Sequence, residues 1–232
     1  MSSVSDPSTP IVAIPAILLA VRAMNPSSIV TLLDDAVERH GLDVTIDEVV
    51  FPVLRVVGTF WASGTLDVAH EHLLSSAVTR WVYAQLQHQR ISRRGRVLLA
   101  AGPHDLHVLG LDCFELLLAR RGVEVANLGG QIPTESLVLA ATSAGATAVV
   151  VCSHNPTATT QAARAVRAVS VAGFPVYYAG SSFDSRFVRQ HTPGDALYAP
   201  LSVSADLLTR RHTVAAAAAE SGSVRSAAQL TA

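Results

Sequence analysis

The spacing of hydrophobic residues changes near residue 90 and divides the chain into two parts. From residue 10 to residue 89, apolar positions recur every three or four residues, as they do along amphipathic helices. We expect Pro52 to kink or shorten the third helix, Gly64 to end it and Thr65 to cap the fourth. The short connections predict a four-helix bundle over residues 10–89, with helices near 10–23, 27–40, 46–62 and 65–89.

From residue 95 onward, short apolar runs alternate with helical patterns. This alternation predicts an α/β domain in which helices cover both faces of a parallel sheet. Five strands in about 120 residues are typical of a flavodoxin-like, Rossmann-like domain, here residues 95–218. The expected strands are 97–101, 123–128, 146–152, 174–179 and, more weakly, 196–199, and the expected helices are 106–121, 134–144, 157–172, 184–191 and 202–218. Residues 219–232 are rich in Ala and Ser, and we expect a flexible tail.

Composition excludes several classes of protein. Half of the residues are hydrophobic, 15% are charged and the formal net charge is −1, which is unlike a disordered, nucleic-acid-binding or membrane-surface protein. The apolar run Ile11 to Val21 is too short to span a bilayer. Cys113 and Cys152 lie in apolar segments and favour a reducing, cytoplasmic setting. The basic cluster Arg90 to Arg96 is interpreted as a solvated linker between the domains, not as a phosphate site.

The candidate chemistry begins directly after the first expected strand, with the spacing Asp-x-His-x-x-Gly. A neutral imidazole at His107 can coordinate a borderline metal such as cobalt. Asp105 is placed to accept the other ring N–H, and Gly110 lacks a β-carbon that would keep a flat macrocycle away from the helix. The motif alone is equally compatible with a polar turn in which an Asp caps a helix and a His is exposed.

Zinc is an alternative at this turn. His104 could join His107 and Asp105, but no further spaced ligands follow. His70 and His72 flank a glutamate without the His-Glu-x-x-His spacing, so the two rings point to different helix faces.

With a helical bundle before it and four more strands after it, the Asp105/His107/Gly110 pattern resembles the cobalamin-binding unit of methionine synthases, corrinoid methyl carriers and cobalamin photoreceptors. The likeness extends over residues 10 to 215. It implies that His107 is the lower axial ligand of cobalt, in place of the cofactor's own nucleotide base, and that the helical bundle caps the cofactor. The displaced nucleotide tail would then enter the α/β domain.

The same resemblance implies a pocket for that tail, lined in the family by Ser-x-Leu after strand three and Gly-Gly after strand four. Ser153 and Gly180 stand at matching places, with Ser181 next to them. Asn155 replaces the Leu and Ala179 the first Gly, which alters the detail of the pocket. Small residues that merely close strand ends are the alternative interpretation.

A second motif lies in the helical half. Trp61, nine further residues and then Glu71-His72 resemble the Trp-x9-Glu-His pattern of light-sensing adenosylcobalamin proteins of the CarH, LitR and AerR type. The resemblance implies that Trp61 covers the upper face of the cofactor, that Glu71 binds the ribose hydroxyls of the adenosyl group, and that Val68 faces the same chamber. A core tryptophan and a solvated Glu71-His72 face are the alternative.

Two departures from those photoreceptors bear on function. Ala62 stands where, in those photoreceptors, a His follows the Trp and can capture cobalt after illumination, and His70 and His72 are candidates for that role here. The chain opens on the bundle, without the winged-helix DNA-binding domain of those repressors. We therefore expect a non-enzymatic, photoresponsive adenosylcobalamin sensor that controls transcription through a separate DNA-binding partner or through homo-oligomerisation. A corrinoid methyl carrier and a cobalamin storage or delivery protein are the alternatives.

Overall fold

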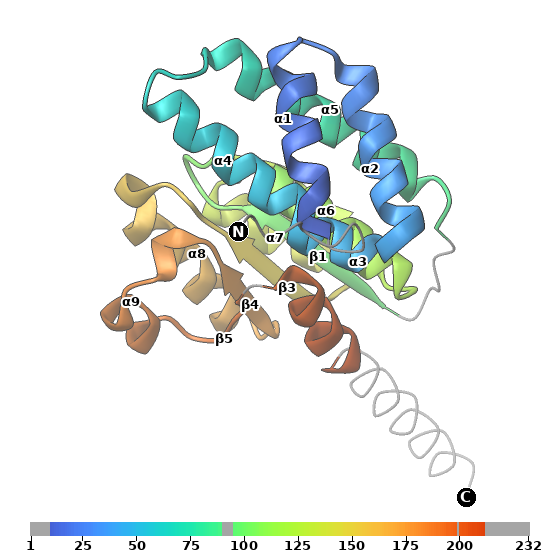
Figure 1. The fold of residues 1–232 in the computed structure, drawn as a ribbon. Coiled ribbons are helices and arrows are strands. Elements are labelled where there is room, and N and C mark those ends of the chain that lie inside the picture. Colours follow the sequence, from blue (N-terminus) through green and yellow to red (C-terminus); the bar gives the residue numbers. More distant parts are fainter. Residues whose placement is uncertain (1–9, 90–94, 199, 212–232) are drawn as a thin grey trace, which may run out of the picture. The chain divides into compact units, whose positions relative to one another are not determined.

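A computed structural model describes residues 10–89, 95–198 and 200–211 (Figure 1). The chain divides into two compact units. The helical unit holds the chain up to His88, together with Leu201 and Ser202, and the α/β unit holds the remainder to Tyr198 and from Val203. Residues 90–94 of the predicted basic linker, the end of the last predicted helix and the predicted tail lie outside the described residues. Arg96, predicted as the end of that linker, is the first residue of the first strand.

The helical unit is built on four long helices joined by short turns. Its core includes Ile17, Ile29, Leu33, Leu74 and Trp81 from α1, α2 and α5, and further buried side chains come from α3, η2 and α4. Among the described residues, no helix combines the length and the hydropathy needed to cross a membrane. The elements are η1 (Pro10–Val12), α1 (Ala13–Arg22), α2 (Pro26–His40), α3 (Leu42–Thr45), η2 (Ile46–Val50), α4 (Phe51–Ala62) and α5 (Val68–Leu86).

The chain stays helical across Pro52, but its hydrogen-bonding pattern changes just before it. Residues Ile46–Val50 form a π-helical turn, and Pro52 then lies in the first turn of α4. A proline is tolerated there because the first N–H groups of an α-helix have no partner within the helix. The expected disturbance is therefore a change of helix type and not a break.

The predicted cap of α5 is wrong by two residues. Gly64, with a φ of +72°, ends α4 as expected. Thr65 then pairs with Ser63 through their side-chain oxygens, 2.9 Å apart, and does not cap the next helix. Asp67 is the N-cap, because its Oδ1 accepts the N–H of Ala69 at 2.8 Å.

The α/β unit confirms the predicted fold class. Five parallel strands lie in the order β2-β1-β3-β4-β5, the flavodoxin-like order (Figure 1). The elements are β1 (Arg96–Ala101), α6 (Leu109–Arg120), β2 (Glu124–Asn127), α7 (Thr134–Ser143), β3 (Ala146–Cys152), η3 (Pro156–Ala158), α8 (Thr159–Val171), β4 (Val176–Ala179), η4 (Ser181–Phe183), α9 (Arg186–His191) and β5 (Asp195–Ala196). Residues 201–211 form a last helix.

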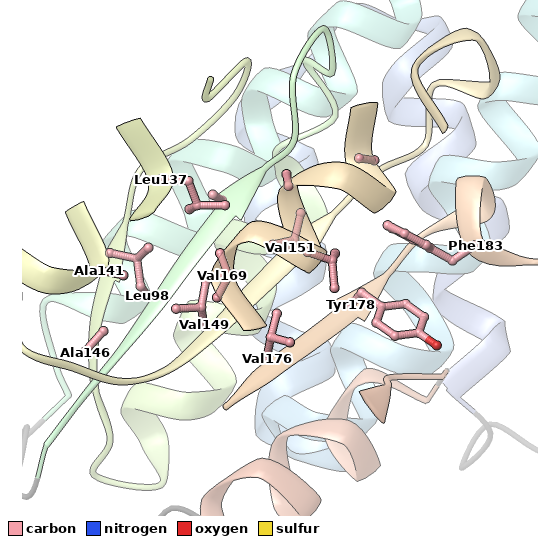
Figure 2. Close-up of a cluster of buried hydrophobic side chains, with 14 residues drawn as sticks. Leu98, Leu137, Ala141, Ala146, Val149, Val151, Val169, Val176, Tyr178 and Phe183 are labelled. Carbon is pink, nitrogen blue, oxygen red and sulfur yellow. The ribbon is translucent and has the colours of Figure 1, made fainter. Parts of the chain in front are cut away.

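Alternating positions of the inner strands form the core on one face of this sheet. Leu98 of β1, with Val149 and Val151 of β3, packs with Val169 of α8 in one buried cluster, which α7 joins through Leu137 (Figure 2). Burial of such aliphatic side chains stabilises the fold by roughly 1.5–3 kcal/mol each. The core holds the carboxyl ends of β1, β3 and β4 at one edge of the sheet.

Several predicted boundaries among the described residues of this unit differ from the structure by one or two residues, and two differ by three. The predicted strand 196–199 is the shorter β5, which begins one residue earlier than predicted. Gly194 (φ +88°) approaches Val176 so closely that a β-carbon would overlap its carbonyl oxygen, and pairing with β4 begins at the next residue. The predicted helix 106–121 begins only at Leu109. The carboxylate of Asp105 accepts the N–H of His107 at 2.9 Å, and this local turn competes with a helical start.

Candidate functional site

The carboxyl ends of three neighbouring strands bring the predicted α/β residues to one edge of the sheet. Asp105 and His107 follow β1, Ser153 follows β3, and Gly180 and Ser181 follow β4. In open parallel sheets this edge is where ligands bind. The six residues predicted for this unit include one more, Gly110, in the first turn of α6.

Asp105 is the buried centre of this edge. Only 1% of the residue is exposed. Its Oδ1 accepts the backbone N–H of His107 at 2.9 Å and lies 2.7 Å from the Nδ1 of the same residue. Its Oδ2 accepts the backbone N–H groups of His154 and, at 3.3 Å, Asn155. One carboxylate thus connects the ends of β1 and β3.

These donors determine the charge state of Asp105. Burial is the largest single influence and raises the pKa of its carboxyl group. The N–H groups of His107 and His154 and the ring of His107 together outweigh it, so the pKa of Asp105 lies below its ordinary value. The group is therefore a carboxylate at neutral pH.

His107 is presented outward by its buried partner. Its side chain is 68% exposed, whereas the carboxyl group that it contacts is fully buried. A carboxylate accepts only the protonated nitrogen, so Nδ1 carries the hydrogen and the lone pair of Nε2 is left for an external ligand. The neighbouring Leu106 is 71% exposed, which places an apolar surface beside the imidazole.

The donor set fits a metal that brings its other ligands with it. Among the described residues, no group of three or more His, Cys, Asp and Glu side chains converges on a possible metal position. A structural zinc ion takes four ligands, mostly from the protein. One outward imidazole suits instead an ion already held by a macrocycle, such as the cobalt of a corrinoid.

Gly110 leaves open space on the surface of α6. No described atom outside its local helix lies within 4 Å of the position that a β-carbon would take. Packing within the described part of the α/β unit therefore does not require a glycine there, and the approach of a flat group to this turn stays a prediction.

Gly180 and Ser153 have a structural role in closing the strand ends. With a φ of +101°, Gly180 lies so close to Ser153 that a β-carbon would overlap its carbonyl oxygen. The hydroxyl of Ser153 is buried and lies 2.9 Å from that of Ser182. Their part in a nucleotide-tail pocket stays a prediction.

His154 lies in the candidate site although the sequence predicted no role for it, and Asn155 was considered only as the replacement of a Leu in the tail pocket. The ring of His154 lies 5.7 Å from that of His107, centroid to centroid. Desolvation lowers the pKa of His154, against the opposing influence of the Asp105 carboxylate. The side-chain amide of Asn155 donates to the carbonyl of His104 at 2.8 Å. A His-Asn pair directly after a buried strand was the available signal.

The predicted residues of the helical unit lie around the turn between α4 and α5. Trp61 is 51% exposed and Val68 40% exposed, so Trp61 is not the core aromatic of the alternative interpretation. The Oε1 of Glu71 accepts the hydroxyl of Ser75 at 2.6 Å, and its Oε2 lies 2.7 Å from the Nδ1 of His72. Glu71 is thus oriented at both oxygens.

His70, the other candidate to replace the missing histidine at Ala62, differs from His72. The Nδ1 of His70 is buried without a hydrogen-bond partner among the described residues. The side chain of His72 is 73% exposed and engages Glu71. The two rings therefore experience different surroundings, as their spacing on a helix predicts.

Comparisons with known proteins found one family match and two curated relatives. Residues 14–84 match the B12 binding domain family. The chain is 34% identical over 122 residues to the HTH-type transcriptional repressor CarH of Myxococcus xanthus, a match covering 53% of this chain and 41% of the repressor. It is 28% identical over 123 residues to methionine synthase of Mycobacterium leprae (strain TN), covering 44% of this chain and 10% of that enzyme. The chain thus spans less than half the length of either relative.

The fold has a counterpart among solved structures. The monomethylamine corrinoid protein of Methanosarcina barkeri has a TM-score of 0.65 and 12% identity, over 84% of this chain and 96% of that one. At this identity the likeness shows the fold alone. The likeness stands beside the match of residues 14–84, in the helical unit, to the B12 binding domain family.

Proposed function

We propose that this protein is a light-responsive adenosylcobalamin sensor and not an enzyme, with His107 as the lower ligand of cobalt. The observation that carries the proposal is the 2.7 Å contact between the Nδ1 of His107 and the buried Oδ1 of Asp105. It supports the proposal because a carboxylate accepts the hydrogen of Nδ1, which leaves the lone pair of Nε2 for a metal. The charge of Asp105 increases the basicity of that nitrogen, which strengthens its bond to a metal.

Adenosylcobalamin, when bound, supplies a cobalt–carbon bond that visible light can break. The protein's part is to hold the cofactor and to respond to the loss of its upper ligand. Trp61 and Val68 would contact that ligand through apolar surface. Glu71, already oriented by Ser75 and His72, would accept hydrogen bonds from ribose hydroxyls. Because these contacts exist only with the upper ligand present, its loss can bias the protein between two states.

The output of such a sensor would be a change in self-association or in binding to a separate DNA-binding regulator. Support for a regulatory role is the 34% identity to a transcriptional repressor. The described residues provide exposed apolar side chains that a partner could cover, including Trp61 and Val68 themselves.

A corrinoid methyl carrier is the second candidate. The match to methionine synthase favours it. A methyl carrier needs an upper face that admits a methyl donor and an acceptor, whereas the exposed Trp61 and the oriented Glu71 suit a bulky polar ligand. Transfer of the methyl group from protein-bound methylcobalamin to a thiol acceptor, catalysed by a partner methyltransferase, would reverse the ranking.

The sensor proposal is tested by loading the protein with adenosylcobalamin in the dark. Visible spectra and size-exclusion profiles are recorded before and after green light, with a methylcobalamin-loaded sample and a dark-kept sample as controls. We expect a light-dependent spectrum and a changed oligomer size for adenosylcobalamin. An unchanged spectrum together with an unchanged size would contradict the sensor function.

A further inference from the structure

The loop of residues 128–132, which follows β2, supports the loop of residues 103–108 that carries His107. The backbone N–H of Gln131 donates to the carbonyl of Asp105 at 2.8 Å. Two further bonds fasten the 128–132 loop to the end of β1: Ala101 donates to Gly129 at 2.8 Å, and Ile132 donates to Ala101 at 3.2 Å. Asp105 and the end of the strand before it are therefore hydrogen-bonded to the same loop.

Gly130 makes the closest approach between the two loops. A β-carbon at this position would lie 3.0 Å from the carbonyl oxygen of Asp105, 3.3 Å from Cγ1 of Val108 and 3.5 Å from Cα of Leu106. These three residues surround His107 in sequence. A side chain at residue 130 would therefore push the 103–108 loop away by a few tenths of an ångström, because a carbonyl oxygen on the backbone cannot rotate aside as a side chain can.

Both loops contain a residue in a conformation that is unfavourable without such contacts. Gln131 has a φ of +56° and His104 a φ of +61°. Each costs roughly 1–2 kcal/mol for a residue with a β-carbon. The hydrogen bonds that hold them offset this strain: Gln131 donates to Asp105, and the carbonyl of His104 accepts from Asn155.

Asn127 anchors the 128–132 loop to helix α6. Its Oδ1 accepts the N–H of Gly129 at 3.1 Å, and its Nδ2 donates to Asp112 at 3.0 Å and to Glu115 at 2.9 Å. Helix α6 follows directly after His107 in the chain. The 128–132 loop is therefore hydrogen-bonded, through Asn127, to the helix that follows the 103–108 loop.

We propose that the 128–132 loop sets the position of His107, with Gly130 and Gln131 as positioning residues for cobalt ligation. The inference rests on the proposed cobalamin binding and extends it to residues that carry no ligand chemistry themselves. Nothing in the Asp105/His107/Gly110 pattern includes this loop. A displacement of Asp105 would misdirect Nε2, since the carboxylate orients the ring, and outer residues of this kind commonly change metal affinity by about 10–100-fold.

The test uses Gly130→Ala in the full chain, with Gly102→Ala as its matched control. Gly102 lies at the end of β1, where a methyl group would meet Ala162 at an ordinary 3.6 Å. Hydroxocobalamin is titrated into each protein, and nitrogen ligation is measured by electron paramagnetic resonance of the reduced Co(II) form. We expect about tenfold weaker binding and a loss of protein nitrogen coupling for Gly130→Ala, and wild-type behaviour for Gly102→Ala.

A second pair of variants removes the hydrogen bond without adding bulk at Gly130. Gln131→Pro lacks the donor N–H and cannot adopt the positive φ of residue 131, so it releases the loop from Asp105 on both grounds, whereas Gln131→Gly keeps the N–H and tolerates that φ. We expect weaker ligation for Gln131→Pro alone. Wild-type coupling in both Gly130→Ala and Gln131→Pro would overturn the inference and leave the proposed function intact. Wild-type protein that shows no histidine coupling would overturn both.

Discussion

The Nδ1 of His107 lies 2.7 Å from the Oδ1 of Asp105, with the carboxyl group buried and the imidazole exposed. The buried partner is held by backbone N–H groups from two strand ends, so the direction of the exposed ring is determined from within the α/β unit. A surface histidine without such a partner would sample several rotamers. This asymmetry is what distinguishes a ligand from an ordinary polar turn.

Replacing the Asp105 carboxylate should destabilise the fold as well as the ligand. In Asp105→Asn, an NH2 group that cannot accept hydrogen bonds replaces one carboxylate oxygen. Because both oxygens of Asp105 accept N–H groups, at least one donor loses its acceptor. We expect the free energy of unfolding at pH 7 to fall by about 2–3 kcal/mol. Urea unfolding of the α/β unit, followed by circular dichroism, measures the change.

The same variant predicts a pH dependence. The folded pKa of Asp105 lies below its ordinary value, so its stabilising contribution is present above about pH 4 and disappears as the pH falls further. The difference in the free energy of unfolding between wild type and Asp105→Asn should therefore become smaller in acid. Asp206→Asn, which breaks the exposed ion pair with Arg121, serves as control and should cost less than about 1 kcal/mol. A stability difference between wild type and Asp105→Asn that stays constant down to pH 3 would contradict the lowered pKa of Asp105.

Asp112 predicts the opposite pH dependence. Burial raises its pKa, and the nearby Glu115 raises it further against the hydrogen bond from Asn127. A raised folded pKa stabilises the protein below the ordinary pKa, and this contribution is lost as the pH rises through the folded value. We expect Asp112→Asn, whose carbonyl can still accept from Asn127, to be more stable than wild type at pH 7. In urea unfolding, this extra stability of Asp112→Asn should become smaller towards pH 4. Extra stability that increases towards pH 4 would contradict the raised pKa of Asp112.

The close approach of Gly180 to Ser153 predicts a large effect of one methyl group. Gly180→Ala adds a β-carbon where the carbonyl oxygen of Ser153 lies, at a backbone φ of +101°. We expect a loss of about 2–4 kcal/mol in the free energy of unfolding. Gly173→Ala has a similar positive φ of +90° but no neighbour within 4 Å, and should cost only about 1–2 kcal/mol. Equal losses for both variants, in thermal or urea unfolding, would show that the contact with Ser153 is unimportant.

Trp61→Ala separates cofactor binding from folding. Because Trp61 is 51% exposed, its truncation should change the free energy of unfolding by no more than about 0.5 kcal/mol. If Trp61 contacts the upper ligand, affinity for adenosylcobalamin should fall about tenfold and affinity for hydroxocobalamin much less. Leu19→Ala, at another exposed apolar position of the helical unit, is the control. Equal affinity losses for both cobalamins would remove Trp61 from the upper-ligand site.

The sequence predicted the order of elements because each hydrophobic run has one periodicity and a length that fits its element. It also predicted the Asp105–His107 contact, since a two-residue separation in a turn leaves those side chains adjacent. Boundaries were harder. The start of α5 at Val68 depends on whether Thr65 or Asp67 supplies the cap, and both have suitable side chains. The start of α6 at Leu109 depends on Asp105 bonding backward onto its own turn.

The parts of the site that escaped prediction are contacts between segments distant in sequence. The N–H of His154 reaches Asp105 across 49 residues, and Gln131 reaches it from another loop. Backbone amides have no sequence signature, because every residue except proline has one. Only the glycine pair before Gln131 hinted at a close approach, and its partner became visible in the folded α/β unit.

The most direct test of the account is the identity of the nitrogen on cobalt. Protein carrying 15N-labelled histidine is loaded with cobalamin, reduced to Co(II) and examined by electron paramagnetic resonance beside an unlabelled sample and His107→Ala. The account predicts that the label changes the nitrogen hyperfine pattern in wild type and not in His107→Ala. Identical patterns in labelled and unlabelled wild type, with the cofactor's own base or water on cobalt, would contradict the assignment of His107 as the lower ligand.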